Sequence, residues 1–286
     1  YNHMEHTIDS NDKHHLISYN GRLSSGLYYT TNSGGSWTST MVDSGAYGLG
    51  YKSDIELDSN NNPHVVYEAG GAVGLNYTYL SNGVWSTPTT IDFDAKNEPK
   101  LVIDSNDNLH VVSLQRNNGG VANYTTNVGG SWVSESFWTG TNTQYPNHVD
   151  IALNSSDNVS ISFLRAHGNS NPSRSVTVYE QNGSTWDSEM VDYAQGISSY
   201  KIELQIDSYD VRHIYYYKGG PEIRNDASGT WSSNLYTLTT INGDHVGDMK
   251  IEANGTVHLV YKNSQWSQLN KFVYSTNITG SWVQKE

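Results

Sequence analysis

The sequence predicts an all-β fold, a six-bladed β-propeller built from four-stranded antiparallel blades. Three observations support this prediction. One motif recurs six times along the chain, at a spacing of about 47 residues that is typical of propeller repeats. Each copy contains short runs of strand-like alternation. No capped run with helical periodicity appears. We therefore expect residues 1–286 to form one domain, with blades near 1–45, 46–93, 94–140, 141–193, 194–240 and 241–286.

The first strand of each repeat is predicted to end at a polar turn. In the second repeat, Ile55 and Leu57 alternate with Asp54 and Glu56, which is the period of a strand with one buried face. The turn follows at once, and Asn, Asp and Ser favour turns. Clear Asp-Ser-Asn turns occupy residues 9–11, 58–60 and 104–106, and weaker copies begin at Asn154, Asp207 and Glu252.

Two more strand-like runs and a tryptophan complete each repeat. In the second repeat the runs are residues 63–67 and 75–79. The fourth strand is predicted to begin at the tryptophan, which recurs as Trp37, Trp85, Trp132, Trp186, Trp231 and Trp282. Four short strands per repeat are the content of a propeller blade.

The corner before the tryptophan resembles a known motif. Residues 30–37 read Thr-Thr-Asn-Ser-Gly-Gly-Ser-Trp, which is similar to the Asp box (Ser-x-Asp-x-Gly-x-Thr-Trp) of sialidase-type, or BNR-repeat, propellers. Residues 125–132 repeat it and residues 275–282 form a looser copy, all with Asn where the family has Asp. The resemblance implies the propeller fold and a structural turn. It does not imply sialidase activity, because the Arg-Ile-Pro signature of that family is missing.

Composition narrows the function. The formal net charge of -13 makes nucleic acid and anionic membrane surfaces poor partners. No run of about eighteen apolar residues occurs, so no membrane span is predicted. The chain has no cysteine, which excludes disulfides, thiol nucleophiles and thiolate metal sites. We expect a secreted or cell-surface protein of prokaryotic origin.

A histidine recurs six residues after the start of each turn except in the fourth repeat, which has Ser160. Equivalent positions in a propeller lie one blade apart, too far to share a metal ion at about 2 Å. Hairpin pairing is expected to place His64 beside Leu57, with its ring nitrogens bonded to neighbouring backbone groups. No metal is predicted at this column, which comprises His15, His64, His110, His213 and His258.

A carboxylate recurs four residues before each turn, except that the third repeat has Lys100. First strands line the central channel of a propeller, so these groups could bind a cation or supply an acid and base with divergent pKa values. The alternative is a water-filled channel lined by solvated charges. The column comprises Glu5, Asp54, Asp150, Glu203 and Asp248, and the cation would lie near the last four. No other cofactor is predicted.

The repeats diverge mainly between the second and third strands, and the longest insert is residues 165–174. These loops share one face of a propeller with the loops that connect blades, and aromatic rings and cations on this face suit a glycan. Ordinary loop decoration is the alternative reading. The predicted ligand-binding residues are Arg116, Trp138, Tyr145, His148, Arg165, His167, Arg174, Lys218 and Trp266.

These observations favour an extracellular carbohydrate-binding propeller, similar to a lectin or adhesin, with a glycan or polysaccharide as its partner. One alternative is a polysaccharide lyase or glycoside hydrolase that acts on an acidic glycan. A lyase would use His148 or Tyr145 as base and Arg165 to neutralise the uronate carboxylate. A second alternative is a protein-interaction scaffold with an exposed apolar patch. The binding module is favoured because no catalytic signature is complete.

Overall fold

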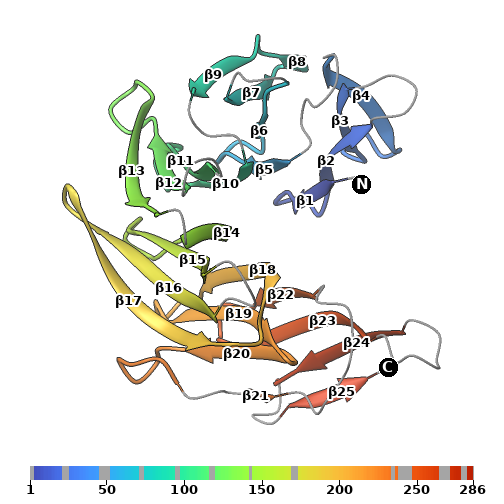
Figure 1. Ribbon diagram of the computed structural model, residues 1–286. Coiled ribbons are helices and arrows are strands. Elements are labelled where there is room, and N and C mark those ends of the chain that lie inside the picture. The colour runs from blue at the N-terminus through green and yellow to red at the C-terminus, as the bar shows by residue number, and fades with distance from the viewer. Residues whose placement is uncertain are drawn as a thin grey trace. The chain divides into compact units, whose positions relative to one another are not determined.

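The computed structural model describes most of the chain as antiparallel sheet. The described residues are 3–20, 26–44, 52–70, 74–93, 97–115, 120–141, 144–168, 173–232, 236–237, 247–263, 271–277 and 282–285, and they contain no helix. Contacts divide the chain into two units, residues 1–139 and 140–286. Each unit holds three blades in chain order (Figure 1).

Unit one contains the first three blades. Blade one consists of β1 (Met4–Ile8), β2 (His14–Asn20), β3 (Gly26–Thr31) and β4 (Thr38–Asp43). Blade two consists of β5 (Ser53–Leu57), β6 (Pro63–Glu68), β7 (Leu75–Ser81), β8 (Val84–Trp85) and β9 (Thr89–Asp92). Its fourth strand is split, since β8 and β9 both pair with β7. Blade three consists of β10 (Asn97–Ile103), β11 (Leu109–Gln115), β12 (Val121–Thr126) and β13 (Val133–Thr139).

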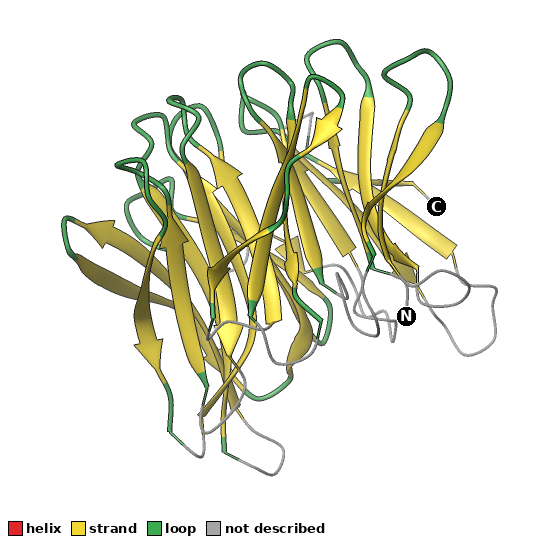
Figure 2. Cartoon of the chain, turned by 90° about the horizontal axis from the view of Figure 1, so that it is seen from above, coloured by secondary structure: helices red, strands yellow, loops and turns green. Residues whose placement is uncertain are grey.

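Unit two contains the last three blades. Blade four consists of β14 (Gln144–Leu153), β15 (Val159–His167), β16 (Ser173–Asn182) and β17 (Thr185–Ala194). Blade five consists of β18 (Ile197–Ile206), β19 (Arg212–Lys218), β20 (Pro221–Asn225) and β21 (Tyr236–Thr237). Blade six consists of β22 (Gly247–Ile251), β23 (Val257–Asn263), β24 (Lys271–Thr276) and β25 (Val283–Lys285). Every described element in Figure 2 is a strand, turn or loop, so the predicted fold class, an all-β six-bladed propeller, is confirmed.

Each first strand ends directly before its turn, as predicted. In blade two the Asp58 carboxylate accepts the backbone N–H groups of Asn60 and Asn62 at 2.9 and 2.7 Å. Asn61 completes the turn with φ of 62°, a left-handed conformation that Asn and Asp tolerate better than most residues. The equivalent left-handed residues are Asp12, Asp107, Asp157, Asp210 and Gly255.

Four of the five column histidines are buried, as predicted, and His258 is partly exposed, but the register and the partners differ from the prediction. His64 pairs with Glu56 and Pro63 pairs with Leu57, because the left-handed residue of the turn returns the chain one residue earlier than a plain hairpin would. In blade two, Nδ1 of His64 lies 2.7 Å from the hydroxyl of Tyr77 on the third strand, and not next to a backbone group as predicted.

The core of each unit lies between neighbouring blades. Val176 and Val178 of blade four pack with Ile202 and Ile214 of blade five. The tryptophan of each later blade covers the preceding one, and the ring of Trp85 meets that of Tyr29 edge-on at 5.3 Å. Clusters of the same kind join blade one to two, two to three, and five to six. Trp85, Trp132, Trp231 and Trp282 are therefore part of the scaffold, whereas Trp37 is 58% exposed.

The corners that resemble Asp boxes are also structural turns. The side chain of Asn32 accepts the backbone N–H of His14 at 2.8 Å, which fixes the corner to the start of the second strand. Asn127 does the same for Leu109 at 2.7 Å. Blade five holds a further copy with Asp226, which accepts the N–H of Arg212 at 2.9 Å and was missed in the sequence.

The segment predicted as the longest loop insert is largely strand. β15 continues to His167 and β16 begins at Ser173, and the two strands pair over this whole length. The insert therefore lengthens the hairpin of blade four, because the extra residues continue the hydrogen-bonded ladder. Residues 169–172 lie outside the described residues.

Candidate functional site

Four side chains gather at the loop end of blade four, where the hairpin is extended. Ladder pairing places Arg165 beside Ser175 and Ser175 beside Tyr193, so the three share one face of the sheet. Arg165 Nε donates to Ser175 Oγ at 2.9 Å, and His167 Nε2 lies 3.0 Å from the same oxygen. The rings of His167 and Tyr193 meet edge-on at 5.3 Å. We call Arg165, His167, Ser175 and Tyr193 the blade-four cluster.

The electrostatics of the blade-four cluster follow from its packing. Burial and the nearby Arg165 guanidinium both lower the pKa of His167 below its ordinary value of 6.5. The imidazole is therefore neutral at pH 7, with one donor and one acceptor nitrogen. Tyr193 is 53% exposed. The cluster thus presents one cation, one neutral imidazole and one accessible aromatic ring.

Three other predicted site residues lie on the opposite face of the same sheet. Tyr145 pairs with Ala166, and Ala166 pairs with Arg174. His148 pairs with Leu164, which packs toward blade five. The structure therefore brings Arg165 and His167 together but separates Arg165 from Tyr145 and His148. Arg174 Nη1 donates to the Ile197 carbonyl at 2.6 Å.

Four predicted site residues remain, namely Trp138, Arg116, Trp266 and Lys218. Trp138 lies within β13 rather than in a loop and is only 9% exposed, because it continues the ladder opposite Ala122. Arg116 and Trp266 lie outside the described residues. Lys218 Nζ donates to the carboxylate of Asp192 at 2.9 Å.

Asp192 is the centre of a polar contact between blades four and five. Its carboxylate also accepts from the Tyr216 hydroxyl at 2.7 Å and from Arg224 Nη2 at 3.0 Å. Burial acts to raise the pKa of Asp192, but these donors and the two cations outweigh it and lower the pKa. Lys218 is therefore committed to holding two blades together. Asp192 and Arg224 could not be predicted from the sequence, because nothing in either strand alone indicates the ion pair between them.

The carboxylates before the turns connect one blade to the next. Asp54 accepts the backbone N–H of Leu101 at 2.8 Å. Asp150 likewise accepts from Leu204 at 2.8 Å, and Glu203 accepts from Met249 at 2.7 Å. Within the described ranges, no three His, Asp or Glu side chains gather closely enough to hold a metal ion. The cation near these residues stays a prediction.

One pair of these carboxyls, Glu203 and Asp248, has pKa values shifted in opposite directions. Burial raises the pKa of Glu203 well above its ordinary value, despite the ammonium of Lys201. For Asp248, burial is outweighed by the hydrogen bond from Glu203 and by Lys201, so its pKa is lowered. Lys201 contacts both carboxyls. Burial therefore favours the protonated form of Glu203 more than that of Asp248, and Lys201 Nζ also donates to the Gly247 carbonyl at 2.7 Å.

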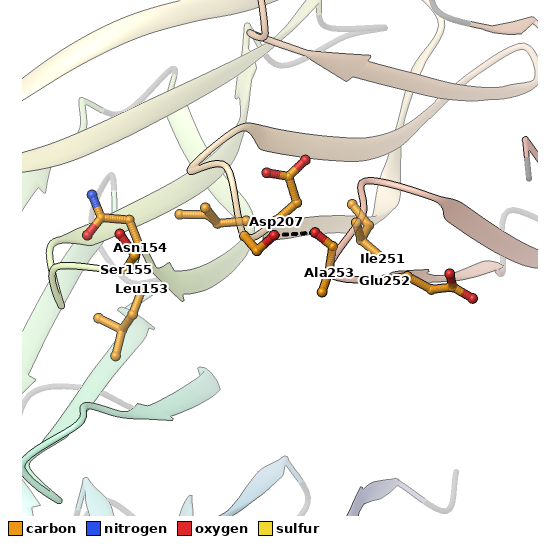
Figure 3. Close-up of a pocket in the computed structure, with 9 residues that line it drawn as sticks. Leu153, Asn154, Ser155, Asp207, Ile251, Glu252 and Ala253 are labelled. Atoms are coloured by element: carbon orange, nitrogen blue, oxygen red, sulfur yellow. Dashed lines mark hydrogen bonds between the residues drawn. The ribbon is translucent and has the colours of Figure 1, made fainter. Parts of the chain in front are cut away.

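A depression of about 340 Å³ lies at the C-terminal ends of β14, β18 and β22, the first strands of the three blades of unit two (Figure 3). Leu153, Ile206 and Ile251, the last residues of β14, β18 and β22, contribute its apolar surface. The turns that follow supply the rest of the lining, which comprises Asn154, Ser155, Asp207, Ser208, Glu252 and Ala253.

No protein-family model and no curated protein sequence matches this chain. Solved structures do match it. A lectin from Burkholderia pseudomallei aligns over 98% of this chain and 82% of its own, with a TM-score of 0.71 and 11% identity. A lectin from Aleuria aurantia in complex with Fucα1-6GlcNAc aligns over 100% and 94%, with a TM-score of 0.64 and 11% identity. An ulvan lyase bound to GlcA(1-4)Rha3S aligns over 97% and 78%, with a TM-score of 0.61 and 12% identity.

These similarities establish the fold. The Aleuria aurantia lectin is itself a six-bladed β-propeller, which agrees with the six sheets seen here. At 11–12% identity the likeness does not carry over any ligand or activity. Among the described residues, no helix is long and apolar enough to cross a membrane.

Proposed function

We propose that this protein is an extracellular carbohydrate-binding propeller and that the blade-four cluster binds the glycan. The observation that carries the proposal is the convergence of Arg165 and His167 on Ser175 beside the exposed ring of Tyr193. Two of the structurally similar propellers are lectins, which supports the class of function.

The chemistry of the cluster suits a sugar with an acidic group. The apolar face of a sugar ring can stack on Tyr193, while hydroxyls exchange hydrogen bonds with the neutral imidazole of His167. Ser175 is fully buried and holds Arg165 and His167 in place. Arg165 can pair with a carboxylate or sulfate in the geometry that guanidinium favours. The overall charge of -13 repels polyanions at long range, so binding depends on this local cation.

A polysaccharide lyase is the second candidate, and one observation favours it. His167 is neutral at pH 7 because burial and Arg165 lower its pKa, so it can accept a proton next to a cation. In a lyase, the base would take the C5 proton of a uronate while Arg165 neutralises the carboxylate, and the C4–O bond would break to leave a C4–C5 double bond. The departing C4 oxygen would take a proton from water and become a hydroxyl group. The structurally similar ulvan lyase makes this chemistry worth testing.

The corners before the tryptophans also bear on which type of repeat the chain contains. The side-chain and backbone bonds of Asn32, Asn127 and Asp226 support reading these corners as degenerate Asp boxes. On this reading the repeats are of the BNR type, and they supply the scaffold alone.

One experiment separates the candidates. The protein is incubated with a uronate-rich polysaccharide and with a neutral one, and both retention and unsaturated products are measured. We expect retention on the uronate-rich polymer, weakened by Arg165→Ala, without product. Product formation that His167→Ala abolishes would favour the lyase. Failure to bind either polymer would overturn the proposed function.

A further inference from the structure

The depression in unit two lies far from the blade-four cluster. β14 runs from Gln144 to Leu153; Pro146 pairs with Arg165 of the cluster, and Leu153 lines the depression. Seven residues of extended strand separate the two points, about 20 Å at 3.3 Å per residue. A ligand of one sugar ring cannot reach both, so the depression is independent of the cluster.

Beside the depression, the hydrogen bond that links the polar turn of one blade to the turn of the next blade differs from its counterparts elsewhere. In unit one, the hydroxyl of Ser59 donates to the left-handed residue Asp107 of the next turn at 2.7 Å. Ser155 donates to Asp210 in the same way, also at 2.7 Å. The next turn has Gly255 at this position. Because glycine offers no carboxylate, Ser208 donates to the Ala253 carbonyl instead. The side chain that joins neighbouring turns elsewhere is therefore missing between blades five and six.

Blade five also departs from the repeat at its exposed turn. Where the first three turns have Asn11, Asn60 and Asn106, this turn has Tyr209. Tyr209 directly follows the lining residue Ser208, and it is 72% exposed. Tyr209 is not among the residues that line the depression, but its exposed ring follows one of them directly in the chain.

The lining has the chemistry of a site for a sugar ring. Leu153, Ile206 and Ile251 offer apolar surface. Asn154 uses its carbonyl oxygen to bind the N–H groups of Ser156 and Asn158, which leaves its amide hydrogens for a ligand. The hydroxyls of Ser155 and Ser208 each donate within the protein and still have lone pairs to accept. Apolar surface with separate donors and acceptors matches a pyranose.

Size and charge restrict the ligand further. A volume of about 340 Å³ lies at the small end of ligand pockets, which run from roughly 300 to 1,000 Å³, and so favours one ring over a chain. Asp207 and Glu252 supply carboxylates to the lining, and none of its residues is cationic. An anionic sugar is therefore disfavoured. We propose that this depression is a second saccharide site, specific for a neutral sugar ring and separate from the blade-four cluster.

The test uses ligand-observed saturation-transfer NMR on the whole protein. The probes are the methyl glycosides of glucose, galactose and mannose, with methyl glucuronide as the anionic probe. We expect transfer to at least one neutral glycoside and weaker transfer to the glucuronide. Ala253→Leu places a larger side chain in the depression and is expected to weaken binding at least about tenfold, a change of about 1.4 kcal/mol. Tyr209→Asn, which restores the residue of the other turns, is expected to weaken it less.

Arg165→Ala is the matched control and is expected to leave neutral binding unchanged, so that the two sites fail or succeed separately. Ala253 is exposed, and an unchanged melting temperature would show that the variant is folded. The proposal is overturned if no neutral glycoside binds, if Ala253→Leu and Tyr209→Asn both leave binding intact, or if Arg165→Ala abolishes it.

Discussion

The Nδ1 atom of His110 lies 2.6 Å from the hydroxyl of Tyr124, and its Nε2 lies 3.3 Å from the carboxylate of Asp104. A carboxylate can only accept, so Nε2 carries the proton and Tyr124 donates to Nδ1. The same tyrosine contact recurs at His15, His64 and His258. The column histidines, which resemble catalytic or metal-binding residues in the sequence, thus connect the turn, the second strand and the third strand of a blade.

Removing the tyrosine hydroxyl tests this connection. Tyr124→Phe leaves the Nδ1 of a buried imidazole without a donor, and we expect the free energy of unfolding to fall by about 1–3 kcal/mol. Tyr79→Phe is the control, since Tyr79 is 39% exposed and its ring stacks on those of His64 and Tyr77. Urea denaturation of both variants measures the difference. Equal effects would contradict the assigned contact.

The turn aspartate predicts how stability responds to acid. Burial acts to raise the pKa of Asp104, but the bonds from Asn108, Asn106 and His110 outweigh it and lower the pKa below 3.8. Because the folded pKa is depressed, this carboxylate stabilises the protein above pH 3.8 and its contribution is lost as the pH falls through the folded value.

Asp104→Asn should keep the turn, since Asn154 makes the same two backbone contacts in blade four. We expect the gap in melting temperature between wild type and this variant to narrow as the pH is lowered from 6 toward about 3. A gap that stays constant with pH would show that the charge of Asp104 contributes nothing.

Glu203 predicts the opposite trend. Burial raises its pKa well above 4.5, so the folded state holds a proton that the unfolded state releases, and the stability contributed by this group falls as the pH rises through the folded value. Glu203→Gln keeps an acceptor for the N–H of Met249 without a charge. We expect its melting temperature, relative to wild type, to rise by about 2–4 °C for each 1 kcal/mol gained at higher pH. A relative decline above pH 7 would show that the ion pair with Lys201 dominates.

The left-handed turn residues allow a matched comparison. Asp12 and Asp107 have φ of 59° and 61°, but only Asp107 accepts bonds from a neighbouring turn, through Ser59. Replacement by glycine relieves the same backbone cost in both. We expect Asp12→Gly to change the unfolding free energy by less than about 0.5 kcal/mol and Asp107→Gly to lower it by about 1–2 kcal/mol. Similar values for the two variants would argue against the contact between turns.

Much of the fold could be predicted from the sequence because it is repeated. The polar turn directly follows the first strand in every blade, as predicted. The fourth strand begins within one residue of Trp37, Trp132, Trp186 and Trp282, whereas Trp85 ends β8 and β21 begins five residues after Trp231. The register of His64 was wrong by one residue because the left-handed conformation of Asn61 is not visible in a strand pattern. The longest insert was misread because a hairpin extension and a loop of equal length look alike before pairing is known.

The candidate site was only partly predictable. Arg165 and His167 stand out by chemistry, but their shared partner Ser175 depends on ladder register. Tyr193 was missed although its position offers a signal, since an aromatic residue also follows the equivalent Asp92, as Phe93. The depression was missed because its lining comes from the strand ends and turns of three different blades. Such a site becomes visible only when neighbouring turns are seen together.

Tyr193 and Phe93 provide the most direct test of glycan binding by the blade-four cluster. Both rings are exposed, at 53% and 71%, but Tyr193 lies beside His167. Binding of the wild type, Tyr193→Ala and Phe93→Ala to a uronate-rich polysaccharide is compared by isothermal titration calorimetry. We expect Tyr193→Ala to weaken binding about tenfold or more, a loss of roughly 1.4 kcal/mol of binding free energy. We expect Phe93→Ala to leave binding unchanged. Undiminished binding by Tyr193→Ala would contradict glycan binding by this cluster.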